Sequence, residues 1–304
     1  MKKIYFPNLN GLRFVAALIV MLYHFYGLEL INGHYGVVLF FALSGFLITY
    51  LLLEEKESTR EISILKFYMR RVLRIWPLYF LILLGACFYI LIFNTENIGF
   101  LKNIYYYLFF GSNIAFALSI TIPYAGILWS VGSEEQFYFF WPWIIKKFNR
   151  KVILSFMIVF ILFFTFIPHL LNYINYNLYS SIYIQKTSDV IGILGFNAML
   201  TGSLSAFIAK IYPKYLRFIY NIFFQLILYV FIIITLLTDF FPHFSYTDEI
   251  YAILFSIVIL NLALNPNSLI SLENKSFKFL GKISYGLYVF HPIAFAIIHS
   301  NHKK

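Results

Sequence analysis

An arginine and a histidine lie eleven residues apart in the first apolar segment of the chain, as Arg13 and His24. Eleven residues of an α-helix turn by about 1,100°, which is three turns plus about 20°. The two side chains should therefore share one face, about 16 Å apart along the axis. Histidine can serve as a general base or a nucleophile, and an arginine within a membrane span needs a polar cavity or a partner. The alternative is a structural ion pair for Arg13 and an interfacial position for His24.

Two further arginines, Arg71 and Arg74, close a basic segment that precedes an apolar run. Residues three apart on a helix point in similar directions. Two guanidinium groups so placed can hold a phosphate through forked, charge-assisted hydrogen bonds. The alternative is topological charge in contact with lipid headgroups.

Two adjacent carboxylates, Glu134 and Glu135, follow Trp129 near the predicted outer end of another apolar segment. The N-terminal end of a helix favours negative charge. Glu134 could orient an imidazole ring or contact a sugar hydroxyl. The alternative is that both carboxylates only cap and solvate the helix.

A small pair, Ser44 and Gly45, stands in the middle of an apolar segment. Small residues allow the close approach of a neighbouring helix or a ligand. Ser44 is therefore a candidate for ligand binding, with helix packing alone as the alternative. His291 near the end of the chain would by itself be a hydrogen-bonded core residue.

The elements that position these residues are predicted to be membrane-spanning helices. The chain of 304 residues is 61% hydrophobic and only 12% charged, whereas soluble domains are roughly 25% charged. We predict an all-α, polytopic bundle of about nine to ten transmembrane helices, forming a single domain over residues 1–304. Hydropathy gives nine spans, near residues 8–27, 35–53, 76–93, 127–145, 152–170, 190–209, 218–238, 249–265 and 284–299.

The distribution of basic residues predicts the orientation of these spans. With a cytoplasmic N-terminus, 18 of the 23 lysines and arginines fall in cytoplasmic segments and only four in outer segments. A complete span at 102–118 would move the basic cluster at 146–151 outside, so we expect a surface or re-entrant helix at 102–118. The net charge of +10 is thus explained by the basic residues that fix the orientation of the spans. We therefore expect the lipid bilayer as a partner and no nucleic acid.

The motifs together resemble the membrane acyltransferase family 3, the bacterial O-acyltransferases of surface polysaccharides. Five family elements occur here in order and cover nearly the whole chain: Arg13 with His24, the phenylalanine-rich Phe40–Leu47, Arg71 with Arg74, Trp129–Tyr138, and Ser284–Pro292. Family members usually carry about ten spans, so we expect this chain to lack the last helix of the family. We see no fused soluble domain.

The resemblance implies an acyl-coenzyme A donor, usually acetyl-CoA, on the cytoplasmic side. It implies that the acceptor is a hydroxyl of a polysaccharide or lipid-linked glycan on the outer side of the bacterial inner (plasma) membrane. His24 would be the catalytic histidine, and Arg13, Arg71 and Arg74 would support donor binding or catalysis. We expect no metal.

A working hypothesis joins these residues into one path. The coenzyme A phosphates would meet Arg71 and Arg74, with Ser44 also in donor binding, and the pantetheine arm would pass Arg13. The thioester would then arrive near His24, which acts as a base or forms an acyl-imidazole. Two other classes stay open: a transporter or flippase of glycan intermediates, and a non-catalytic scaffold.

Overall fold

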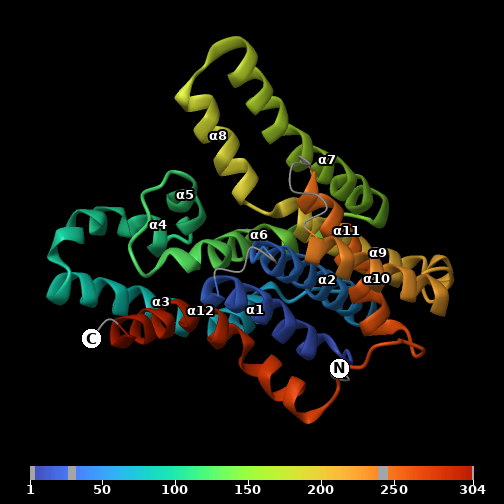
Figure 1. Cartoon of the computed structure of the whole chain (residues 1–304). Helices are drawn as coiled ribbons and strands as arrows, with labels where there is room; N and C mark the ends of the chain where they lie inside the picture. The colour runs from blue at the N-terminus through green and yellow to red at the C-terminus, as the bar shows by residue number, and fades with distance from the viewer. Residues whose placement is uncertain (1–3, 27–31, 239–245, 303–304) are drawn as a thin grey trace. The chain divides into compact units, whose positions relative to one another are not determined.

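The computed structural model describes residues 4–26, 32–238 and 246–302, and within these ranges all regular secondary structure is helical (Figure 1). This confirms the predicted all-α class. In the part of the chain that the structure describes, five helical segments are long and apolar enough to cross a membrane, namely His34–Thr59, Ile64–Phe93, Arg150–Tyr179, Ile182–Ile211 and Thr247–Leu264. The segment Ile182–Ile211 is counted across a break between α8 (Ile182–Ile193) and α9 (Phe196–Ile211). Two shorter apolar helices span Leu9–Phe25 and Ile222–Thr238. The multi-pass character follows from these helices, while the count of nine to ten spans stays a prediction.

The chain forms two units that interleave along the sequence. Unit 1 comprises Met1–Ile62, Ile145–Leu162 and Asn197–Tyr288, and unit 2 comprises Ser63–Ile144, Phe163–Phe196 and Val289–Lys304. The prediction of a single domain over residues 1–304 stays a prediction.

Unit 1 is built around the second helix of the chain. It contains α1 (Leu9–Tyr26), α2 (His34–Thr59), most of α9 (Phe196–Ile211), α10 (Ile222–Thr238) and α11 (Thr247–Leu264), with parts of α7 (Arg150–Ile174) and α12 (Lys275–His302). Helix α2 packs most extensively against α1 and α11 (Figure 1).

Small residues explain how α2 and α9 approach so closely. A Cβ on Gly45 would overlap the carbonyl oxygen of Met199, and a Cβ on Gly202 would overlap that of Ala42. The two helices thus meet backbone to backbone at reciprocal glycines. The small pair at 44–45 therefore serves helix packing through its glycine.

The ends of the unit 1 helices test the predicted sidedness. Lys56 Nζ donates to the carbonyl oxygens of Ile145 (2.6 Å) and Phe148 (2.8 Å). Glu57 pairs with Arg150 (2.9 Å) and with Lys210 (3.1 Å). Three segments predicted to be cytoplasmic thus meet at one end, which confirms that they lie on the same side as one another.

The opposite helix ends also meet as predicted. His34 at the start of α2 lies 2.8 Å from Asp248 at the start of α11. Asn197 Nδ2 donates to Glu249 at 2.8 Å. His34, Asp248 and Glu249 fall at span ends that were predicted to face the outer side, so these contacts agree with the predicted pairing of sides for α2 and α11.

Unit 2 holds the helices on either side of the 102–118 segment. It contains α3 (Ile64–Phe93), η1 (Thr95–Asn103), α4 (Ile104–Leu108), α5 (Ser112–Ala117), η2 (Gly126–Leu128), most of α6 (Trp129–Lys147), η3 (Asn175–Tyr179) and α8 (Ile182–Ile193), with parts of α7 and α12. Helices α4 and α5 have five and six residues, so each rises less than about 10 Å. Neither helix is long enough to cross a bilayer, which agrees with the predicted surface or re-entrant segment at 102–118.

Two helix boundaries differ from the predicted ones. The span predicted at 190–209 is broken between α8 and α9, because Gly195 adopts a left-handed backbone (φ 63°). Ser133 Oγ donates to the freed carbonyl of Ile193 at 3.2 Å. The span predicted to start at Trp76 instead continues a helix from Ile64, so Pro77 is an interior residue of α3. The basic segment and the apolar run are therefore one helix.

Candidate functional site

Arg13 and His24 lie on one uninterrupted helix, α1, as their spacing predicted. The Arg13 side chain is half-buried, and its Nη1 lies 3.4 Å from Asn10 Oδ1. His24 is exposed near the C-terminal end of α1, and its ring meets the Tyr23 ring edge to face at 5.4 Å.

The hydrogen bond of His24 assigns its tautomer. Nδ1 lies 2.9 Å from the carbonyl oxygen of Val20, one turn earlier on α1. A carbonyl oxygen only accepts, so Nδ1 carries the proton, and the neutral ring then has its lone pair on Nε2. When the ring is neutral, this hydrogen bond leaves Nε2 as the nitrogen through which a base or nucleophile would act.

Ser44 is half-buried on α2, next to the glycine that packs against α9. In the same part of unit 1, the Phe40 ring contacts the Tyr288 ring at 5.6 Å. Two of the sequence motifs, the phenylalanine-rich element and the late serine–tyrosine element, therefore meet in the fold. The role of Ser44 in donor binding stays a prediction.

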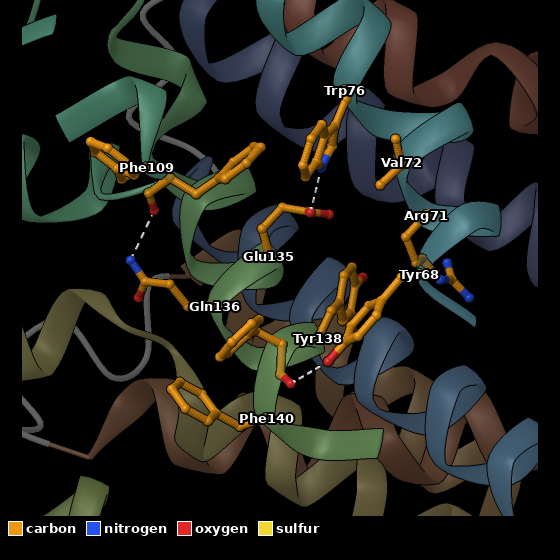
Figure 2. A pocket seen from close by; sticks show the side chains of 11 residues that line it. Tyr68, Arg71, Val72, Trp76, Phe109, Glu135, Gln136, Tyr138 and Phe140 are labelled. Atoms are coloured by element: carbon orange, nitrogen blue, oxygen red, sulfur yellow. Dashed lines mark hydrogen bonds between the residues drawn. The ribbon is translucent and has the colours of Figure 1, made fainter. Parts of the chain in front are cut away.

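Unit 2 contains a cavity of about 550 Å³ between α3, the 109–110 turn and α6 (Figure 2). Its walls are mostly aromatic. The lining residues are Tyr68, Arg71, Val72, Trp76, Phe109, Phe110, Glu135, Gln136, Tyr138, Phe139 and Phe140.

Three hydrogen bonds hold α3 and α6 together along this cavity. Trp76 Nε1 donates to Glu135 Oε2 at 2.8 Å. Tyr68 OH donates to the carbonyl oxygen of Phe139 at 2.7 Å and accepts from Trp143 Nε1 at 2.9 Å. The earlier residue of α3 contacts the later residues of α6, and the later residue of α3 contacts the earlier one, so the two helices run antiparallel. The carboxylate of Glu135 thus lies at the level of the middle of α3.

The face of α6 that carries Gly132 is fixed against the turn that precedes α5. A Cβ on Gly132 would lie 2.5 Å from Ser112 Oγ and 2.8 Å from the carbonyl oxygen of Phe110. Gln136 Nε2 donates to the Phe110 carbonyl and to Asn113 Oδ1, both at 2.9 Å. Residues three and four after Gly132 share its helix face, which directs Glu135 and Gln136 toward the cavity.

Two charged groups of the cavity have hydrogen-bonding capacity left over. Arg71 Nε and Glu135 Oε1 are both buried and make no hydrogen bond among the residues that the structure describes. The Arg71 guanidinium lies over the rings of Tyr138 (5.4 Å) and Phe67 (5.6 Å). Aromatic faces attract a guanidinium, so the rings hold its position while Nε stays unpaired.

The two carboxylates of the acidic pair have different surroundings. Glu135 lines the cavity that Arg71 also lines, and the expectation that both lie at the outer mouth of a span stays a prediction. Glu134 instead accepts from Tyr138 OH at 3.0 Å. Sequence reasoning selected Glu134 and missed Glu135. Gly132 is the sequence feature that could have indicated Glu135. A glycine in a helix can mark a closely packed face, and Glu135, three residues later, lies on the same face of α6.

Arg74 is exposed on α3 and does not line the cavity, whereas Arg71 does. The predicted residues fall into two groups: Arg13, His24 and Ser44 belong to unit 1, while Arg71, Arg74 and Glu134 belong to unit 2. A single site that joins both groups stays a prediction. Across the described residues, no three His, Cys, Asp or Glu side chains gather as metal ligands would.

Comparison with known proteins identifies the family of the whole chain. A family model for an acyltransferase domain matches residues 6–301. A Staphylococcus aureus (strain COL) protein, provisionally named an O-acetyltransferase, is 27% identical over 317 residues, covering 97% of this chain and 52% of the relative. The O-acetyltransferase OatA of S. aureus (strain NCTC 8325 / PS 47) is 28% identical over 308 residues, covering 94% of this chain and 50% of OatA.

The chain spans about half the length of these curated relatives. No solved structure gives a significant match. The family model covers the segments that carry His24, the cavity between α3 and α6, and the late motif at 284–292. The chain therefore belongs to the acyltransferase domain family.

Proposed function

We propose that this protein transfers an acyl group, acetyl in the first instance, from acyl-CoA to a hydroxyl of a cell-envelope polysaccharide or its lipid-linked precursor. The observation that carries the proposal is the family match over residues 6–301. The names of the relatives, which are O-acetyltransferases, support acetyl as the group and a hydroxyl oxygen as its destination.

The tautomer of His24 supports a direct role in the transfer. Nε2 takes the proton of the acceptor hydroxyl while the oxygen attacks the thioester carbonyl. The carbon–sulfur bond then breaks, and the proton passes from His24 to the coenzyme A thiolate. In the second form of the mechanism, Nε2 attacks the thioester carbonyl and displaces the coenzyme A thiolate, which leaves a transient acyl-imidazole. The acceptor hydroxyl then attacks the acyl carbon, the imidazole leaves, and the hydroxyl proton passes to the thiolate. Both forms need the lone pair on Nε2.

The other predicted residues have supporting roles in this proposal. Arg13 lies on the same helix, about 16 Å from His24 along its axis, and would contact the donor as it reaches the histidine. Arg71, Arg74 and Ser44 would bind the donor. Glu134 would orient the imidazole or contact the acceptor. The protein would act in the bacterial plasma membrane with its N-terminus in the cytoplasm, which the excess of basic residues in the predicted cytoplasmic segments favours.

A transporter of glycan intermediates is the second candidate, and the break between α8 and α9 favours it. Discontinuous helices line substrate sites in many transporters. A transporter built from repeats would need a second, related break in its other half, and the break at Gly195 does not by itself supply one.

One assay separates the two candidates. Full-length protein in lipid nanodiscs is mixed with radiolabelled acetyl-CoA and purified envelope polysaccharide, and label in the polysaccharide and free coenzyme A are measured together. An acyltransferase produces both in equal amounts and needs both substrates. A transporter in nanodiscs, which have no enclosed lumen, produces neither, and that result would reject the proposed function.

A further inference from the structure

We propose that the cavity between α3 and α6 is a binding site for a secondary amide carried on an aliphatic chain, with Glu135 accepting from the amide N–H and Arg71 donating to its carbonyl oxygen. The inference rests on the proposed function, because it names the chemical class of ligand that one part of that site would take.

Hydrogen bonding within the cavity leaves few groups for a ligand. Tyr68 OH both donates and accepts, Gln136 Nε2 has two acceptors, and the single donor of Trp76 is used by Glu135. The buried atoms still unpaired are one donor, Arg71 Nε, and one acceptor, Glu135 Oε1. A buried polar atom without a partner is costly, so a ligand that satisfies both atoms gains affinity.

The two unpaired atoms select a neutral ligand. Arg71 and Glu135 line the same cavity, and an ionised Glu135 would balance the charge of Arg71. A phosphate drawn to Arg71 would meet the carboxylate of Glu135, and like charges repel strongly away from water. A secondary amide offers one donor, its N–H, and one acceptor, its C=O, joined through a single carbon, which matches the unpaired acceptor and donor.

The walls select an aliphatic setting for that amide. Apart from these polar groups and Tyr138, whose OH donates to Glu134, the lining consists of Val72 and four phenylalanines at positions 109, 110, 139 and 140. The volume of about 550 Å³ lies within the roughly 300–1,000 Å³ typical of small-molecule sites. A cavity with apolar walls binds the aliphatic part of a ligand, and its few polar groups recognise one functional group of that ligand.

Two molecules of the proposed reaction carry such an amide. The pantetheine arm of acyl-CoA has two secondary amides in an aliphatic chain, and an N-acetylated amino sugar of an acceptor glycan has one. The pantetheine source implies a division of labour, in which the exposed Arg74 serves the phosphates and Arg71 serves the uncharged arm.

The experiment measures binding by isothermal titration calorimetry with the full chain in nanodiscs. The two probes are pantetheine and N-acetylglucosamine, and whichever binds identifies the source of the amide. We expect Arg71→Ala and Glu135→Ala each to weaken the binding of that probe about tenfold, as the loss of one charge-assisted hydrogen bond should. Glu96→Gln removes an exposed carboxylate of η1 and should leave the affinity unchanged.

A second ligand series tests the contact itself. Analogues of the probe in which an ester oxygen replaces an amide N–H lack the donor. Wild type should bind the matching analogue about tenfold more weakly than the amide, whereas Glu135→Ala should bind both equally. Glu135→Gln keeps a carbonyl oxygen in place of the carboxylate, so it provides the same comparison if the alanine variant does not fold.

Three results would overturn the inference: neither probe binds wild type, the variants bind as wild type does, or Glu135→Ala still discriminates amide from ester. If wild type transfers acetyl in the same nanodiscs, any of these results removes the amide site alone and leaves the proposed function in place.

Discussion

Glu135 depends on one tryptophan for its position in the cavity. Trp76 Nε1 is the donor to Oε2, while Oε1 is buried and unpaired. Glu134, its neighbour on α6, has Tyr138 as a hydrogen-bond donor one helical turn later. Adjacent residues on a helix point about 100° apart, so the two carboxylates have separate partners and should respond differently to mutation.

Removal of the Trp76 donor should destabilise the protein. Trp76→Phe keeps an aromatic ring in the cavity but leaves both oxygens of Glu135 without this donor, which costs about 1–3 kcal/mol. Thermal unfolding in detergent measures the loss. Trp143→Phe is the matched control, because the Trp143 side chain is 52% exposed and its donor can turn to water. Equal effects of the two variants would argue against a special role for the Trp76 contact.

A second residue-scale prediction concerns pH. Partial burial raises the pKa of the Glu273 carboxyl, but hydrogen bonds from Lys278, the Asn8 amide and Tyr5 outweigh burial and hold the pKa below its ordinary value. A lowered folded-state pKa gives stability that is fully present above the ordinary glutamate pKa and is lost as pH falls through the folded-state value.

The wild type should therefore have a higher melting temperature than Glu273→Gln at pH 7. The difference in melting temperature should shrink below about pH 4, where unfolded glutamates begin to protonate. Melting temperatures across this pH range provide the measurement. Glu61→Gln, an exposed carboxylate after α2, controls for the loss of one charge. A difference that grows at low pH would contradict the assignment.

At the scale of elements, the glycines on either side of the α2–α9 contact make a sharp prediction. Gly45→Ala places a methyl group against the carbonyl of Met199, and such overpacking costs about 1–3 kcal/mol. Gly85 in α3 has nothing near its Cβ position, so Gly85→Ala should be neutral or stabilising by up to about 1 kcal/mol. Thermal unfolding of both variants gives the comparison, and a loss for Gly85→Ala as large as for Gly45→Ala would contradict the packing account.

The sequence allowed some elements to be predicted and concealed others, for physical reasons. The shared helix of Arg13 and His24 follows from local spacing and was predicted. The break at Gly195 was not, because a glycine within an apolar run reads equally well as part of a continuous span. The placement of Glu135 against Trp76 depends on which positions of α3 meet α6, and hydropathy carries no information about that register.

For the whole molecule, the ion pairs at the ends of the unit 1 helices show which loops share a side. They leave the orientation itself as a prediction, which rests on the excess of basic residues in segments predicted to be cytoplasmic. Cys87 is the only cysteine of the chain, so single-cysteine labelling can test it.

In a Cys87→Ala background, Thr95→Cys should react with a membrane-impermeant maleimide in intact cells, because the segment after α3 is predicted to face outward. Ser58→Cys, near the end of α2, should react only after permeabilisation. Both positions are exposed, so access to the reagent depends on the side of the membrane. The reverse pattern would invert the proposed topology.

The central claim is that His24 accepts the proton of the acceptor hydroxyl or carries the acyl group, and one measurement tests it most directly. Purified His24→Ala protein is assayed for transfer of labelled acetyl from acetyl-CoA to polysaccharide, beside wild type and His169→Ala, a histidine on α7 without a proposed role. We expect His24→Ala to lose at least about 100-fold in rate, as the loss of a general base should, and His169→Ala to match wild type. Wild-type activity in His24→Ala would contradict the account.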